Sequence, residues 1–291
     1  MKLTRNAYGK INLGLDVLRR REDGYHEVKM IMQMVGIYDT LTFTSREDAE
    51  IHIVTNHGSV PCDEHNLIYK AAMVLFEETG RHIGVDVELI KRIPVAAGMA
   101  GGSTDAAAAL LLLNEMLGFP LTKEKLCELA VRVGADVPYC VLGGTALSEG
   151  IGEKLTPLPA PPGAYLVIAK PDIEVSTAFV YKNLHLEQVD KHPDIDGMVK
   201  ALYEASLAGI TKRMENVLET VTIPAYPVIG AIKEICRQEG ACNALMSGSG
   251  PTVFAVYKEK EKAQRTIERI QKENLAREVF LTEFAETEGL Q

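Results

Sequence analysis

The stretch PVAAGMAGGSTDAAAAL at residues 94–110 constrains this chain more than any other part of the sequence. It gathers three glycines and two hydroxyl residues directly before DAAAALLLLNEML (105–117), a strong helix former that stops at Gly118. Glycine allows close approach of a backbone to a ligand, and the first amides of a helix have no intrahelical partner. The stretch predicts an anion site at the head of a helix from about Ser103. A tight turn before a small-residue core helix is the structural alternative.

Two familiar phosphate-binding patterns do not fit this stretch. A Walker A loop requires a lysine after its last glycine, and no lysine lies between residues 94 and 121. The dinucleotide pattern G-x-G-x-x-G does not match the spacing of Gly98, Gly101 and Gly102. Ser103 and Thr104 add hydroxyl groups that can donate hydrogen bonds or contact a metal, and Asp105 is a candidate for holding a cation. Phosphate binding is therefore predicted from backbone geometry alone.

A phosphate-transfer site without a loop lysine needs positive charge from elsewhere in the chain. Lys10 lies in the strand-like segment NAYGKINLGLDV beside a glycine. Asp136 follows a predicted helix end at Gly134 and precedes an apolar run that reads as a strand, with Pro138 marking an edge or bulge. A lone lysine is usually a solvated charge, and an acid at this place can simply cap an element, so both alternatives stay open at this point.

Patterning along the chain indicates two α+β domains. In the first part, residues 11–17, 39–45 and 85–90 alternate as strands do, and residues 66–79 and 121–133 have helical spacing, the second with Thr122 as N-cap. PLPAPPGA (157–164) places four prolines and a glycine in eight residues, so we expect domains at 1–156 and 157–291. Strands at 165–171, 243–257 and 278–284 and helices near 196–209, 226–239 and 261–274 predict helices on one face of an antiparallel sheet.

Composition and charge narrow the classes of function. The net charge of −9 and pI near 5.4 argue against a nucleic-acid partner, and the run Arg19–Arg21 is interpreted as a solvated face. The N-terminus lacks the apolar core of a signal peptide, and the longest apolar run is too short to span a membrane, so a cytoplasmic protein without a membrane partner is expected. The five scattered cysteines indicate buried reduced thiols.

Three segments in order resemble the signature motifs of the superfamily that includes galactokinase, homoserine kinase, mevalonate kinase and phosphomevalonate kinase. They are NAYGKINLGLDV, IPVAAGMAGGSTDAAAAL and NALMSGSGPTVFAVY. Further matches, KINLGLDVLRRREDGYHEV and GADVPYCVLGGTAL, are most similar to the branch that phosphorylates the 2-hydroxyl of 4-diphosphocytidyl-2-C-methyl-D-erythritol in non-mevalonate isoprenoid biosynthesis. The resemblance covers nearly the whole chain. It implies a ribosomal protein S5-like N-terminal domain that binds ATP and a ferredoxin-like C-terminal domain, with the site between them.

The resemblance also implies roles for individual residues. Lys10 matches a catalytic lysine and Asp136 a catalytic aspartate, which accepts or orients the proton of the substrate hydroxyl while Lys10 keeps it ionised. ATP and Mg²⁺ are the implied cofactors, with Ser103 as the candidate metal contact. The implied ATP phosphate loop consists of Pro94, Val95, Ala96, Ala97, Gly98, Met99, Ala100, Gly101, Gly102, Ser103 and Thr104.

The same resemblance implies the substrate side of the site. Asn12 matches a residue that contacts the erythritol portion, and Gly248 and Ser249 match the third motif beside the phosphate loop. Tyr25 and His26 match the cytidine pocket, the tyrosine by stacking and the histidine by hydrogen bonds. Tyr181, on the other face of the cytosine, and Lys182 are looser matches.

The sequence leaves two other classes of function open. The superfamily's other small-molecule kinases are the first alternative, and the D-G-Y-H segment at 23–26 argues against them, because a cytosine pocket serves none of their substrates. An RNA-binding module is the second, opposed by the net charge. The expected partner is a small-molecule substrate, and the expected assembly is a monomer or weak homodimer.

Overall fold

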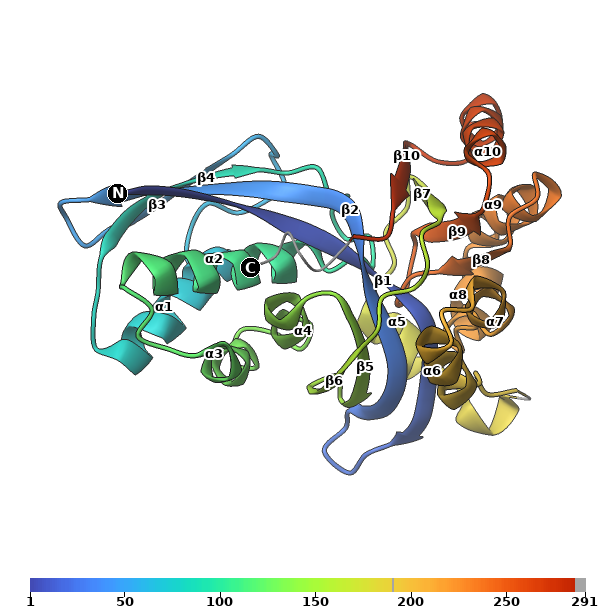
Figure 1. Ribbon diagram of the computed structural model, residues 1–291, viewed down its shortest axis with the longest axis horizontal. Helices are drawn as coiled ribbons and strands as arrows, with labels where there is room; N and C mark the ends of the chain where they lie inside the picture. Colours follow the sequence, from blue (N-terminus) through green and yellow to red (C-terminus); the bar gives the residue numbers. More distant parts are fainter. Residues whose placement is uncertain (190, 286–291) are drawn as a thin grey trace.

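The structure is a computed structural model, and it describes residues 1–189 and 191–285. The first half of the chain forms a six-stranded sheet with helices, and the second half forms a four-stranded sheet with helices (Figure 1). The elements of the first half are β1 (Lys2–Arg20), β2 (His26–Arg46), β3 (Ile51–Thr55), α1 (Leu67–Thr79), β4 (Gly84–Ile90), α2 (Gly101–Met116), α3 (Lys123–Ala130), α4 (Val137–Leu142), β5 (Thr145–Gly150) and β6 (Lys154–Leu158). Those of the second half are β7 (Tyr165–Lys170), α5 (Thr177–Lys182), the 3₁₀ helix η1 (Leu186–Gln188), α6 (Ile195–Tyr203), α7 (Leu207–Lys212), α8 (Glu219–Ala225), α9 (Pro227–Gln238), β8 (Asn243–Met246), β9 (Val253–Tyr257), α10 (Lys260–Lys272) and β10 (Glu278–Glu283).

The long antiparallel hairpin of β1 and β2 connects the two halves of the molecule. Its strands are 19 and 21 residues long and run from the N-terminal sheet to a projecting turn (Figure 1). Ile11 and Leu13 are fully buried in an apolar cluster shared with β7 and β9 of the second sheet. Because side chains alternate along a strand, Lys10 and Asn12 lie on the opposite face. Register shifts on both sides of this segment allow the strand to bend there.

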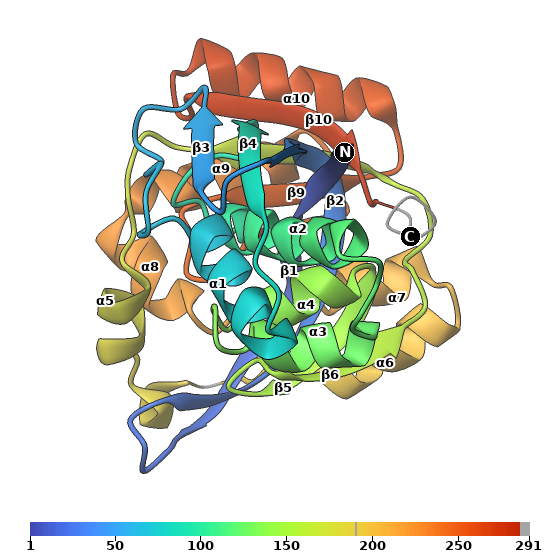
Figure 2. The ribbon, with the colours of Figure 1, turned by 90° about the vertical axis from the view of Figure 1, so that its left-hand side faces the viewer.

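The first sheet has the strand order β3-β4-β2-β5-β6, with β1 paired to β2. Only the β3–β4 pair is parallel among the described ladders, and α1 makes the crossover between these strands. Helices α1–α4 lie on the same side of the sheet (Figures 1 and 2). Helix α1 begins after Asn66, whose side chain accepts a hydrogen bond from the Ile68 amide, and it ends at Gly80 with φ of 61°. Both boundaries agree with the sequence pattern.

The second sheet has the order β10-β7-β9-β8 and is antiparallel throughout. With α9 before β8 and α10 before β10, the chain order is βαββαβ, the ferredoxin-like arrangement that the family resemblance implies. Helices α9 and α10 pack on one face of this sheet, and Leu166 and Ile168 on its other face contact the apolar side of the β1–β2 hairpin. The predicted α+β class with two kinds of domain is confirmed.

Three local predictions are wrong. Residues 137–142 form helix α4 rather than a strand. Pro138 lies in the first turn of this helix, where a backbone N–H would make no hydrogen bond within the helix, so its absence in proline has no cost there. The helix expected over 121–133 ends at Ala130, although Thr122 caps it as predicted. The pattern at 196–209 forms two short helices, α6 and α7, because Ala205 turns with φ of 48° between them.

The cysteines are unpaired in the described part of the chain. Cys140 and Cys236 are buried as predicted, whereas Cys62 and Cys242 are exposed, because they lie in polar loops that pattern reading alone did not place. Among the described residues no helix is long and apolar enough to cross a membrane.

The chain passes from one sheet to the other between Leu158, the last residue of β6, and Tyr165, the first residue of β7. The proline-rich segment 157–164 covers this passage. A domain boundary at 156/157, with domains at 1–156 and 157–291, stays a prediction, and the end of the second range lies outside the described residues.

Candidate active site

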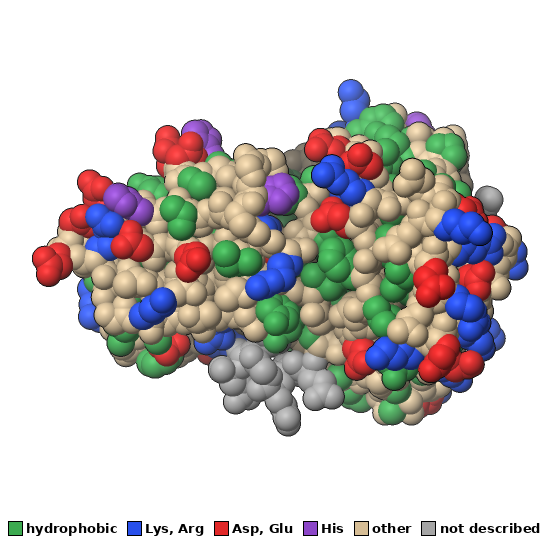
Figure 3. Space-filling view, turned by 90° about the horizontal axis from the view of Figure 1, so that it is seen from above, with side chains coloured by type: hydrophobic (Ala, Val, Ile, Leu, Met, Phe, Trp, Pro, Cys, Tyr) green, Lys and Arg blue, Asp and Glu red, His purple; other side chains and the backbone are tan. Residues whose placement is uncertain are grey.

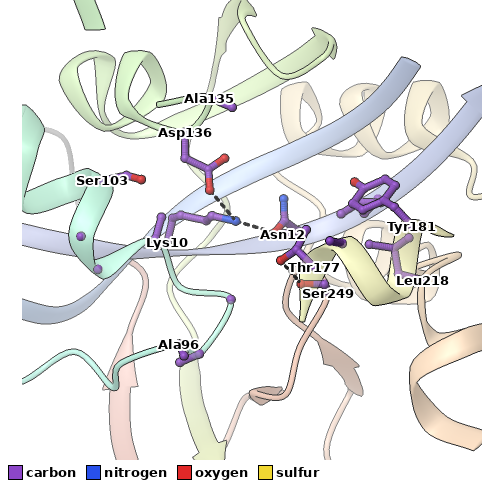
Figure 4. Close-up of a pocket in the computed structure, with 18 of the residues that line it drawn as sticks. Lys10, Asn12, Ala96, Ser103, Ala135, Asp136, Thr177, Tyr181, Leu218 and Ser249 are labelled. Atoms are coloured by element: carbon purple, nitrogen blue, oxygen red, sulfur yellow. Dashed lines mark hydrogen bonds and ion pairs between the residues drawn. The ribbon is translucent and has the colours of Figure 1, made fainter. Parts of the chain in front are cut away.

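One large cleft lies where the two halves of the molecule meet, with a volume of about 1260 Å³. A single small-molecule site usually has about 300–1,000 Å³, so this cleft has room for two ligands side by side. Its wall combines the first half, through β1, the loop before α2 and residue 136, with the second half, through α5 and the turn at 247–250. Figure 4 shows these elements converging.

The loop before α2 forms the backbone-rich part of the wall. Ala96, Gly98 and Ala100 have φ of 53°, 71° and 56°, so the chain turns three times within five residues. Ala100 has no side-chain oxygen to cap α2, and the first amide bonded within the helix is that of Thr104, to Ala100 O at 2.9 Å. The amides of residues 101–103 therefore have no helical acceptor and lie at the positive end of a 16-residue helix.

Two residues of the predicted phosphate loop face away from the cleft. Met99 is fully buried, and its carbonyl accepts the backbone N–H of Lys10 at 3.0 Å. Thr104 is buried and donates its hydroxyl to Tyr8 O at 2.8 Å. Both residues thus fix the loop to β1. The other predicted loop residues line the cleft; they are Pro94, Val95, Ala96, Ala97, Gly98, Ala100, Gly101, Gly102 and Ser103.

Gly98 is held by the turn between β8 and β9. Its carbonyl accepts a hydrogen bond from Ser247 Oγ at 3.0 Å, and a Cβ at position 98 would lie only 2.3 Å from Ser247 O. Gly248 and Ser249 follow in the same turn, and both line the cleft. Ser249 Oγ lies 2.8 Å from the Thr177 hydroxyl of α5. The third sequence motif therefore anchors the predicted phosphate loop and continues into the opposite wall.

Beneath the helix head lies a buried charge cluster that sequence reasoning missed. Lys91 Nζ lies 2.5 Å from Asp39 Oδ2 and 2.8 Å from Asp105 Oδ2, and Asp39 also accepts the amides of residues 92 and 93. Burial acts to lower the pKa of Lys91, whereas the nearby carboxylates of Asp105 and Asp39 act to raise it. The effect of the carboxylates is the larger, so the pKa of Lys91 is above its usual value. Burial raises the pKa of Asp105. The cation that Asp105 contacts is thus Lys91, three residues before the predicted loop.

Lys10 and Asp136 come together although 126 positions separate them in the sequence. Lys10 Nζ lies 3.7 Å from Asp136 Oδ2 and donates a hydrogen bond to Asn12 Oδ1 at 2.9 Å (Figure 4). The Lys10 side chain is 5% exposed, whereas that of Asp136 is 34% exposed. The ammonium is held in a dry environment, and the carboxylate that it stabilises faces the cleft.

At the far end of the cleft, β1–β2 and α5 bring together the residues predicted for cytidine. The rings of His26 and Tyr181 have centroids 5.0 Å apart with an angle of 40° between planes. Tyr25, in the hairpin turn, is 61% exposed, and Lys182 is also exposed. Burial and then the charge of Arg20 lower the pKa of His26, so its imidazole is neutral at pH 7. Burial raises the pKa of Tyr181 to about 12.

Several lining residues carry no pattern that the sequence reading could use. Thr177, the first residue of α5, belongs to no motif read from the sequence, yet its hydroxyl lies 2.8 Å from that of Ser249. Asn66, the N-cap of α1, and Leu67, the first residue of that helix, also line the cleft. Lys91 is separated from IPVAAG by Arg92 alone, so its place near the predicted loop is a signal that the sequence does carry.

Comparison with known proteins agrees with this geometry. Residues 66–144 match the family described as GHMP kinases N terminal domain, and residues 188–276 match GHMP kinases C terminal. A protein of Lachnospira eligens named 4-diphosphocytidyl-2-C-methyl-D-erythritol kinase is 50% identical over 95% of this chain and 96% of its own length. A protein of the same name from Lachnoclostridium phytofermentans is 49% identical over 98% of each chain.

Solved structures give the same result. A crystal structure of a 4-(cytidine 5'-diphospho)-2C-methyl-D-erythritol kinase superimposes with a TM-score of 0.83 at 31% identity, over 98% of this chain and 100% of the other. A homoserine kinase from Cytophaga hutchinsonii, at 21% identity and a TM-score of 0.77 over 96% and 92% of the two chains, shares the fold. This chain belongs to the GHMP kinases and, within them, to the family of the 4-diphosphocytidyl-2-C-methyl-D-erythritol kinases.

Proposed function

We propose that the protein transfers the γ-phosphate of ATP to the 2-hydroxyl of 4-diphosphocytidyl-2-C-methyl-D-erythritol, in non-mevalonate isoprenoid biosynthesis. One observation carries the proposal: the Lys10–Asp136 pair opens onto the same cleft as the unpaired amides at the head of α2. A phosphate group and an acceptor hydroxyl bound at these two places would lie in one space. The names of relatives at 49–50% identity support the choice of substrate.

In the proposed reaction, Asp136 accepts or orients the proton of the 2-hydroxyl while the hydroxyl oxygen attacks the γ-phosphorus and ADP leaves. Lys10 stabilises the carboxylate of Asp136 and the negative charge that develops on the attacking oxygen. Asn12 fixes the position of Lys10 through the 2.9 Å hydrogen bond and faces the acceptor. The amides of residues 101–103 hold the phosphates at the positive end of α2.

The residues at the helix head fit a magnesium ion. Mg²⁺ prefers oxygen ligands, and here Ser103 lines the cleft beside the amides at the head of α2. Ser103 would hold the ion through its hydroxyl, whereas Asp105 is paired with Lys91 on the buried side of the helix. When bound, Mg²⁺ neutralises charge on the β- and γ-phosphates.

The cytidine moiety is proposed to occupy the far end of the cleft. Tyr25 would stack on the base and the neutral His26 would hydrogen-bond to it. Because Tyr181 lies against the ring of His26, it would complete the aromatic wall, with Lys182 at the rim. Gly248 and Ser249 would shape the acceptor side.

A substrate panel tests the proposal. The purified protein is incubated with MgATP and, separately, the cytidylyl substrate, homoserine and mevalonate, and ADP release is measured together with the ³¹P spectrum of the product. We expect transfer to the cytidylyl substrate and none to the other two. Transfer to homoserine or mevalonate in preference would contradict the proposal. Chelation of Mg²⁺ is expected to stop turnover.

The remaining properties stay predictions from composition. We propose a monomer or weak homodimer in the cytoplasm without a nucleic-acid or membrane partner. The net charge of −9 supports the absence of nucleic acid, and on the face seen in Figure 3 acidic and basic side chains are interspersed rather than separated. Light scattering of the purified protein over a range of concentrations tests the oligomeric state.

A further inference from the structure

The sequence indicates that the three arginines at residues 19–21 form a solvated face, but in the structure each of them has different surroundings. Arg19 Nε pairs with Glu27 Oε2 at 2.5 Å, and Arg21 Nη2 pairs with Asp23 Oδ2 at 2.8 Å in the hairpin turn. Arg20 differs from both neighbours, because it lines the cleft and has no hydrogen-bond or ion-pair partner within residues 1–189 and 191–285.

The register of the β1–β2 hairpin explains where Arg20 points. Arg20 lies directly opposite His26, so both side chains are on the same face of the hairpin, while Arg19 and its partner Glu27 are on the other. His26 lines the cleft as well. The charge of Arg20 contributes to the lowered pKa of His26, after burial, which agrees with their proximity.

Arg20 also differs from most other cations of the cleft. Lys10 and Lys91 each have a carboxylate oxygen within 3.7 Å. Among the described lysines and arginines of the wall, Arg20 and Lys182 have no acidic partner, and both belong to the end of the cleft that holds His26. Of the acids that line the cleft, Glu187 lies nearest to Lys182 in the sequence, and its Oε1 is 3.3 Å from His185 Nδ1. Positive charge is therefore available here for a ligand.

We infer that Arg20 binds the diphosphate group of the cytidylyl substrate. This inference rests on the proposed function, in which the base lies at His26. Because Arg20 is exposed and directly opposite His26 in the ladder, its guanidinium faces the phosphates attached to that nucleoside. A guanidinium group donates two parallel hydrogen bonds to phosphate oxygens, which a histidine or an apolar side chain cannot do. Arg20 thus distinguishes a nucleoside diphosphate from the bare nucleoside, at the binding step.

The run itself supplies matched controls for the test. Arg20→Gln removes the charge but keeps most of the side-chain length, and Arg19→Gln removes a charge one position away that faces Glu27. The affinities of each variant and of the wild type for CDP and for cytidine are measured by calorimetry, with the ATP site filled by a non-hydrolysable analogue. We expect Arg20→Gln to weaken CDP binding about tenfold or more and to change cytidine binding less than twofold. Arg19→Gln should change neither.

Two results would overturn the role of Arg20 alone. One is unchanged CDP affinity in Arg20→Gln, and the other is an equal loss for CDP and cytidine, which would indicate a distorted base pocket. Arg20→Lys retains a charge without the paired donors, and partial recovery of CDP affinity supports the assignment. A wild type that binds neither CDP nor cytidine would instead overturn the proposed function, and this inference with it.

Discussion

Replacing Gly98 by alanine should break the contact between the phosphate-binding loop and the turn at 247–250. The new Cβ would lie 2.3 Å from Ser247 O and 3.1 Å from Gly250 O, and both are backbone atoms that cannot rotate away. Gly98 also has φ of 71°, in the left-handed region. Either the loop or the turn must therefore shift, and the hydrogen bond from Ser247 Oγ to Gly98 O depends on their present distance of 3.0 Å.

The expected loss of stability has two parts. An alanine in the left-handed region costs about 1–2 kcal/mol, and forcing a methyl group into a close-packed contact costs about 1–3 kcal/mol. The sum of about 2–5 kcal/mol corresponds to a decrease in Tm of about 3–8 °C for a chain of this size. Because the same loop leads to the amides of residues 101–103, a shift of about 1 Å should also raise the KM for ATP about tenfold or more.

Thermal denaturation and ATP titration of Gly98→Ala test this prediction. Gly163→Ala is a suitable control, because nothing lies within 4 Å of its new Cβ and its φ is outside the left-handed region. The control should match the wild type in both measurements. If Gly98→Ala also matched the wild type in Tm and in KM for ATP, the close approach of the two segments would be refuted.

Three further predictions concern the charged and titratable groups. Asp136→Asn should keep the fold and ATP affinity while kcat decreases about 10²–10⁴-fold in the ADP-release assay, and near-normal turnover would remove Asp136 from the mechanism. Lys91→Met should lower the free energy of unfolding by about 3–5 kcal/mol at pH 7, because Asp39 and Asp105 lose their buried counter-charge; an unchanged urea midpoint would contradict this. Since burial and a neighbouring arginine lower the pKa of His26, the KM for the cytidylyl substrate should be constant from about pH 8 to 6.5 and rise only at lower pH, whereas a rise that begins above pH 7 would show a raised pKa.

The elements that the sequence predicts well are those with long periodic patterns and clear ends. Helix α1, with Asn66 before it and Gly80 after it, follows from capping chemistry. Helix α2 follows from its run of alanine and leucine. The apolar run 137–142 was interpreted as a strand because six residues are too few for periodicity to separate strand from helix. Pro138 after an acid is as typical of a helix start as of a strand edge.

The candidate site was only partly predictable because its parts are far apart in the sequence. The glycine-rich loop carries its chemistry locally, so it could be read from the residues alone. Lys10 and Asp136 could be paired only through resemblance to a family, since no local pattern relates a lysine in one strand to an acid before α4. The run Arg19–Arg21 indicates only a solvated face, because the register that places the exposed Arg20 opposite His26 at the cleft wall cannot be read from the sequence.

The most direct test is a co-crystal structure with a non-hydrolysable ATP analogue and 4-diphosphocytidyl-2-C-methyl-D-erythritol. We expect the triphosphate at the amides of residues 101–103, and the 2-hydroxyl within about 3 Å of an Asp136 oxygen and in line with the γ-phosphorus. A 2-hydroxyl bound away from Asp136, or a γ-phosphate bound away from the head of α2, would contradict the proposed site.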